Sequence, residues 1–171
     1  MNALNFNIKY GLIAGVILII FKYVTLVSLS DASRAAIFLD YLGIIALAGA
    51  SYFAVIEKRK VFNHGSITFG EAFLIGLYVS FIAAVMVGAF LYIYTAYIEP
   101  GRADALIAKT QTDMLAEKRS DEEIKQTIEN IRTYYKPLSQ MLMGTAVILY
   151  GFITSLVIAV FTKKSTNTSK V

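Results

Sequence analysis

Four long apolar runs, separated by polar segments, dominate the pattern of hydrophobic and polar residues along this chain. A helix needs about 20 apolar residues to cross a bilayer, because each residue adds about 1.5 Å of rise. All four runs are long enough, so membrane-spanning helices are predicted over residues 10–29, 37–56, 70–98 and 138–161. We therefore predict an all-α integral membrane protein, a four-helix bundle that forms a single domain over residues 1–171.

The third predicted span carries a ridge of small side chains. These are Ala72, Gly76, Ser80, Ala84 and Gly88, which recur every four residues and so share one face of a helix. Small residues let a second helix approach closely, which is how helices associate in lipid. We expect this helix-packing ridge to lie inside the protein. The alternative is that it joins two copies of the chain.

Residues 101–136 differ from the rest, because they are rich in charges of alternating sign. Ser120 and Glu123 fit a capping box at the start of a helix. Four apolar residues after it share one helical stripe: Ile124, Ile128, Ile131 and Tyr135. We predict an extramembrane amphipathic helical hairpin between the third and fourth spans, with this stripe as the candidate surface for a protein partner. A simple solvated connector is the alternative, although neighbouring helices need only a few linking residues.

Basic residues collect at the ends of the apolar runs. Lys9, residues 58–60 and residues 163–164 all fall on one side of a protein with four spans. Because basic loops remain in the cytoplasm, we predict cytoplasmic N- and C-termini and a 101–136 segment on the outer side, which in a bacterium would be the periplasm. Residues 165–171 are predicted to be a disordered tail. A cleaved signal peptide is the alternative interpretation of the first run, but Lys22 interrupts its apolar region.

Composition supports a membrane protein and excludes several other classes. The chain is 57% hydrophobic and 16% charged, whereas soluble domains are about 45–50% apolar and about 25% charged. The net charge of +4 comes from residues at helix ends rather than from a basic stripe, so no nucleic-acid partner is expected. With no cysteine, one histidine and no ligand spacing among the acidic residues, neither a metal nor another cofactor is expected.

Three ionisable residues in or near the predicted spans are the candidate functional side chains. Lys22 stands well inside an apolar run, where a lysine costs about 2.5–3.5 kcal/mol and usually has a partner. An antiparallel first hairpin places Asp40 at a similar depth, so an ion pair is feasible; an ion or proton path is the alternative. Glu71 fits a capping box with Thr68, and the alternative is a substrate contact at the mouth of a pathway.

No Ser/His/Asp set, phosphate-binding loop or carboxylate dyad occurs in the sequence, so we predict that the protein is not an enzyme. The leading hypothesis is an accessory or scaffold protein that contacts a membrane-protein partner through residues 101–136. The alternative is a small transporter or channel that uses Lys22, Asp40 and Glu71. Four helices leave little room for a pathway, so that alternative requires a homo-oligomer.

Short motifs along most of the chain resemble a known family. They are KYGLIAG at residues 9–15, ITFGEAF at residues 67–73, and a tyrosine-rich exit at residues 94–100 that ends in proline. Together with the charged insert and the final Lys-Lys, they resemble the uncharacterised bacterial membrane-protein family catalogued as domain of unknown function 4199. The resemblance implies a four-helix inner-membrane protein. It implies no catalytic residue, because the family carries no established activity.

Overall fold

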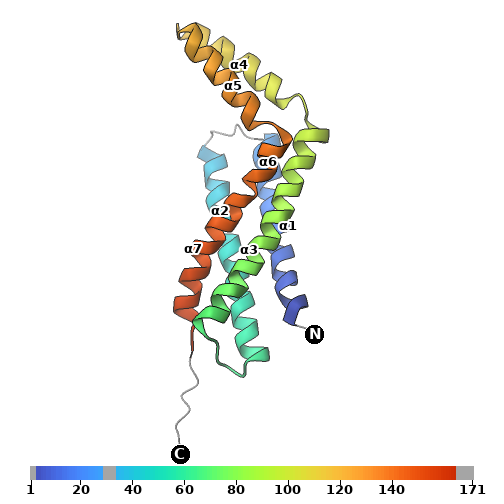
Figure 1. Ribbon diagram of the computed structural model, residues 1–171, viewed down its shortest axis with the longest axis vertical. Helices are drawn as coiled ribbons and strands as arrows, with labels where there is room; N and C mark the ends of the chain where they lie inside the picture. Colours follow the sequence, from blue (N-terminus) through green and yellow to red (C-terminus); the bar gives the residue numbers. More distant parts are fainter. Residues whose placement is uncertain (1–2, 29–33, 165–171) are drawn as a thin grey trace, which may run out of the picture. The chain divides into compact units, whose positions relative to one another are not determined.

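A computed structural model describes residues 3–28 and 34–164 of the chain, and helices dominate it (Figure 1). The elements are α1 (Ala3–Ser28), α2 (Arg34–Glu57), the π-helical turn η1 (Lys58–Phe62), α3 (Phe69–Ile93), the π-helical turn η2 (Tyr94–Ile98), α4 (Arg102–Ala116), α5 (Asp121–Tyr134), α6 (Pro137–Met143) and α7 (Thr145–Thr162). These elements fall into two compact units. The first comprises residues 1–87 and 145–171, and the second comprises residues 88–144. The predicted disordered tail, residues 165–171, lies outside the described residues.

Four helical segments among the described residues are long and apolar enough to cross a membrane: Asn7–Val27, Arg34–Phe62, Phe69–Ile98 and Leu138–Thr162. They coincide with the four runs predicted from the sequence, so the all-α, membrane-type class is confirmed. The second segment is longer than expected, because the helix starts at Arg34 and continues through the basic cluster as η1. The fourth is interrupted at Gly144, and glycine costs about 0.8–1.0 kcal/mol relative to alanine in a helix interior.

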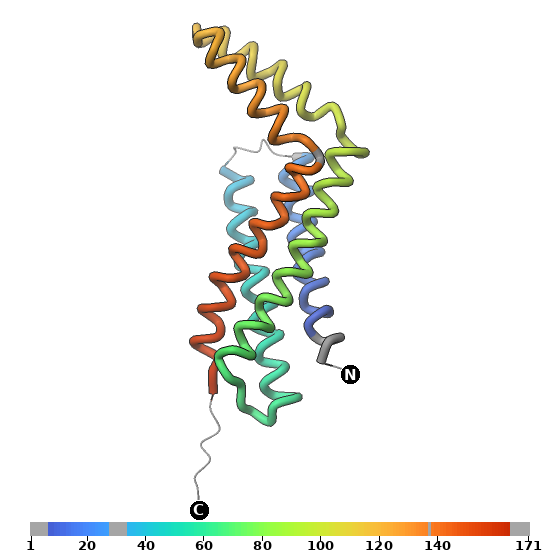
Figure 2. Tube along the Cα trace, viewed as in Figure 1, coloured from blue at the N-terminus to red at the C-terminus, as the bar shows by residue number. Residues whose placement is uncertain are grey.

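The first unit packs α1, α2, the first part of α3 and α7 around a core of small and aliphatic side chains (Figure 2). Buried members include Ala50 and Ala54 of α2, Ala72 of α3 and Ala159 of α7. Small side chains bring the helix axes close together, which is the packing mode available in lipid. Many of the large apolar side chains of these helices are exposed instead, as expected for surfaces that face acyl chains.

Glycines mark the closest approaches between these helices. An added Cβ at Gly11 of α1 would lie 2.6 Å from Ile82 Cβ, and one at Gly15 would lie 2.5 Å from Met86 Sδ, so α3 side chains fill the space above both glycines. On the other side of α3, a Cβ at Gly76 would lie 2.8 Å from Ser155 Cβ of α7. A Cβ at Gly151 of α7 would overlap the side chain of Ser80. Two Gly–Ser contacts therefore hold α3 and α7 together. In one the glycine belongs to α3 and the serine to α7, and in the other the glycine belongs to α7 and the serine to α3.

The second unit contains the end of α3 with η2, the helices α4 and α5, and α6. Figure 1 shows α5 turning back beside α4, and one buried isoleucine from each helix, Ile107 and Ile124, lies in this unit. The predicted capping box is confirmed, because Glu123 N donates to Ser120 Oγ at 3.3 Å and Ser120 N donates to Glu123 Oε2 at 3.3 Å. The connection before it requires a left-handed residue, which is Lys118 at φ 56°.

Candidate functional sites

The helix-packing ridge of α3 is buried along its whole length. Ala72, Gly76, Ser80 and Ala84 lie in the first unit, and all four are buried. Gly88 lies in the second unit, where an added Cβ would be 2.8 Å from Met141 O of α6. Each part of the ridge is thus used for packing within the chain, which leaves it little surface for a second copy.

Lys22 and Asp40 form an ion pair between α1 and α2. The Lys22 Nζ atom lies 2.6 Å from Asp40 Oδ1, and the two side chains are 37% and 53% exposed. Sequence reasoning raised this pairing as feasible, and the structure brings the two residues together. The pair neutralises both charges, so in this arrangement neither stands alone in an apolar helix.

Glu71 is occupied by the backbone at the start of α3. Its Oε2 atom accepts hydrogen bonds from Thr68 N and Thr68 Oγ1, both at 2.9 Å, and Glu71 N donates to Thr68 Oγ1 at 3.2 Å. The predicted capping box is therefore confirmed. Among the residues described, no hydrogen bond or ion pair joins Glu71 to Lys22 or Asp40, so the three candidates do not form one site.

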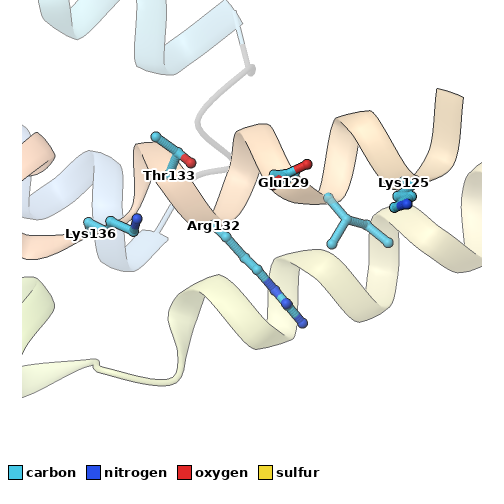
Figure 3. A pocket seen from close by; sticks show the side chains of 6 residues that line it. Lys125, Glu129, Arg132, Thr133 and Lys136 are labelled. Atoms are coloured by element: carbon cyan, nitrogen blue, oxygen red, sulfur yellow. The ribbon is translucent and has the colours of Figure 1, made fainter. Parts of the chain in front are cut away.

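The stripe predicted as a partner surface is partly covered by its own unit. Ile124 is only 7% exposed, and α4 and α5 are in contact. Ile128, Ile131 and Tyr135 are half-buried. Charged and polar side chains dominate the open face of α5. Figure 3 shows Lys125, Glu129, Arg132 and Thr133 of α5, with Lys136 just after its end, around a shallow hollow of about 350 Å³ that Ile128 also lines. The spacing of apolar residues along a helix does not by itself show which face a neighbouring helix will cover.

A polar network that sequence reasoning missed joins the beginning of α1 to the end of α2. Lys9 Nζ lies 3.4 Å from Glu57 Oε2, and the Tyr10 hydroxyl donates a hydrogen bond to the same oxygen. The sequence feature that could have indicated this network is Glu57, an acidic residue directly before the basic residues 58–60. In the described residues, no three His, Cys, Asp or Glu side chains gather as a metal site would require.

Glu99 follows the third apolar segment and accepts two hydrogen bonds within the second unit. The Tyr94 hydroxyl donates to Glu99 Oε2 at 2.8 Å, and Arg102 Nη1 donates to it at 3.0 Å. The hydrogen bond from Tyr94 lowers the pKa of Glu99, and the hydrogen bond and charge of Arg102 lower it further. These contacts join the end of η2 to the beginning of α4.

The lowered pKa of Glu99 predicts a loss of stability in acid. The folded pKa lies below the unfolded glutamate value of about 4.3. The contribution of Glu99 is therefore fully present above that pH and is lost as the pH falls through the lowered folded pKa. Unfolding midpoints measured between about pH 6 and about pH 3 should fall less steeply for Glu99→Gln than for the wild type. Glu122→Gln, at an exposed position of α5, is the control, and an equal slope for Glu99→Gln and wild type would contradict the assignment.

The fold and its charges define a class of protein. Four helical segments in the described parts can cross a bilayer, and basic residues stand near the ends of the second and fourth, so the chain is of the multi-span membrane type. The family model described as "Protein of unknown function (DUF4199)" matches residues 9–164, and the chain belongs to this family. The family resemblance seen in the sequence motifs is thereby confirmed. No curated protein and no solved structure matches the chain.

Proposed function

We propose that this protein is a non-enzymatic accessory or scaffold protein of a bacterial inner membrane, and that α4 and α5 form the hairpin that contacts its protein partner. One observation carries the proposal. A connection that needs only a few residues is instead made by two helices, Arg102–Ala116 and Asp121–Tyr134. Neither helix belongs to the segments that are long and apolar enough to cross a membrane.

The hairpin is conformationally ordered, as a preformed recognition surface needs to be. Ile107 and Ile124 are buried, and the Ser120–Glu123 capping box fixes the start of α5. A preformed surface loses less conformational entropy on binding than a flexible loop does. Packing and capping of this kind are not required of a solvated connector.

The surface that we assign to the partner is the charged face of α5, which includes Ile128 of the predicted stripe but not the buried Ile124. Lys125 and Arg132 lie beside Glu129 on that face, and Lys136, just after the end of α5, lines the same hollow. Leu115 and Tyr134 are exposed apolar side chains of the same unit. Interfaces are commonly enriched in arginine and tyrosine around an apolar centre. Because Ile124 is buried, it supports the hairpin from inside.

The transporter alternative has less support. Its candidate residues are already engaged, Lys22 with Asp40 and Glu71 with Thr68. In addition, the ridge of α3 is used within the chain. We therefore assign these residues to the stability of the fold.

The proposal is tested by replacing residues 102–135 with a flexible Gly-Ser linker and purifying both forms from native membranes in mild detergent. We expect a stoichiometric partner to co-purify with the full chain and to be absent from the linker form. Capture of the same partner in equal amount by both forms would overturn the proposal, and so would a full chain that purifies alone or only with itself.

Charge-reversal variants separate loss of the surface from loss of the hairpin. Lys125→Glu with Arg132→Glu changes the α5 face and should release the partner. Lys109→Glu with Lys118→Glu makes the same change of net charge at other exposed positions of the unit, and it should retain the partner. Equal retention by both double variants would contradict the assignment of the α5 face.

A further inference from the structure

Two basic clusters that are far apart in the sequence meet at one end of the first unit. Arg59 Nη1, in η1, donates to Thr162 O at the end of α7 at 3.2 Å. Ile67 and Lys164 exchange two backbone hydrogen bonds, of 3.0 and 2.9 Å. Figure 2 shows the end of α7 beside the connection between α2 and α3. Residues 58–60 and 163–164 are therefore neighbours in space.

The carboxylates at this end are occupied by other groups. Glu57 accepts from Tyr10 and pairs with Lys9. Glu71 accepts from Thr68, and Asn63 Nδ2 lies 3.4 Å from its other oxygen. No carboxylate in the described residues pairs with the side chains of Lys60, Lys163 or Lys164, and all three residues are exposed. We call these three lysines the basic junction.

The segments that carry the basic junction also carry exposed apolar side chains. Val61 follows Lys60, Phe161 stands two residues before Lys163, and Phe69 follows the loop that pairs with Lys164; all three are exposed. They belong to segments apolar enough to cross a membrane. Long basic side chains at such positions extend toward the headgroup layer while the neighbouring apolar groups remain in the hydrocarbon. A soluble polyanion has no acyl chains to pack against these exposed apolar side chains, so they favour a lipid as the ligand.

We propose that the basic junction binds the phosphate of an anionic phospholipid headgroup, with the acyl chains against the exposed apolar side chains of the same segments. Basic pockets between membrane helices are suited to such headgroups, because several positive charges act on one phosphate at close range. The site lies where helix ends meet the bilayer surface, whichever leaflet that surface belongs to. It is independent of the proposed contact through α4 and α5.

Spin-labelled lipids test this proposal on the full chain in proteoliposomes of phosphatidylcholine. We expect the protein to immobilise labelled phosphatidylglycerol in preference to labelled phosphatidylcholine by about five-fold, which corresponds to about one effective basic contact at about 1 kcal/mol. In the triple variant Lys60→Gln, Lys163→Gln and Lys164→Gln, the ratio between the two labelled lipids should fall to about one, which means that no preference remains. Lipid of one composition on both faces makes the result independent of how the protein inserts.

The matched control is Lys109→Gln, Lys118→Gln and Arg119→Gln, which removes the same charge from exposed positions of the other unit and should keep the wild-type preference. The proposal is overturned if the wild type shows no preference, or if the two triple variants lose it equally. It is also overturned if excess inorganic phosphate displaces the labelled lipid, because the ligand would then be a free anion. The single variant Lys60→Gln should give an intermediate preference even if the triple variant does not fold.

Discussion

Replacing Gly151 by alanine is expected to destabilise the protein by about 1–3 kcal/mol, the usual cost of overpacking a well-packed interior. The added Cβ would overlap Ser80 Oγ and Cβ and would lie 3.6 Å from Ser80 Cα. Ser80 is fully buried on α3, so it has no open space into which to move. The measurement is thermal unfolding of the purified protein in detergent or lipid nanodiscs.

Two further variants make this result specific to the contact between α3 and α7. Gly49→Ala is the matched control, because an added Cβ at Gly49 of α2 meets no atom within 4 Å. It should be neutral or slightly stabilising, since alanine favours a helix by about 1 kcal/mol over glycine. Ser80→Gly should recover part of the loss when combined with Gly151→Ala. Equal effects of the Gly151 and Gly49 variants would show that the two helices are not in close contact.

Removing one partner of the Lys22–Asp40 pair should cost about 1–3 kcal/mol, because the remaining charge is left in an apolar helix without its counter-ion. Asp40→Asn and Lys22→Met should each show this loss. The double variant should be more stable than the sum of the two single changes predicts, because it leaves no unpaired charge. Unfolding of all four forms in lipid nanodiscs gives the coupling energy.

Asp113→Asn is the control for the loss at Asp40. Asp113 is an exposed acidic residue of α4, so the same chemical change is made outside the apolar segments. It should alter the free energy of unfolding by less than about 0.5 kcal/mol, as surface substitutions usually do. If Asp40→Asn costs no more than this control, the ion pair does not stabilise the first helical hairpin.

Local sequence signals predicted most of the secondary structure. Apolar run length identified the four membrane-crossing segments, and Thr68 with Glu71 and Ser120 with Glu123 marked two helix starts correctly. These features depend on neighbouring residues only. For the same reason, the small-residue repeat of α3 could be recognised as a packing face before its partner helix was known.

Contacts between distant segments were not predictable in this way. The bond from Arg59 to Thr162 O and the pairing of Ile67 with Lys164 depend on where the helix ends meet in space. The extension of the second segment through η1 has a related cause. A basic cluster was interpreted as the end of a helix, but long basic side chains reach the aqueous layer from a continuing helix.

The candidate sites also differ in whether local sequence signals were enough to predict them. Lys22 and Asp40 could be paired in advance, because an antiparallel hairpin fixes their relative depth. Ile124 was assigned to an outer surface, although it is buried in its own unit. Its periodicity identified an apolar face correctly but contained no information about α4, which is in contact with α5.

The most direct test of the account is the side of the membrane on which each connection lies. The chain has no cysteine, so single variants Lys60→Cys, Gln111→Cys and Lys163→Cys can be labelled with a membrane-impermeant maleimide in sealed vesicles of known orientation. With four spans, Lys60→Cys and Lys163→Cys should react from one side and Gln111→Cys from the other. Labelling of all three from the same side would contradict the four-span arrangement.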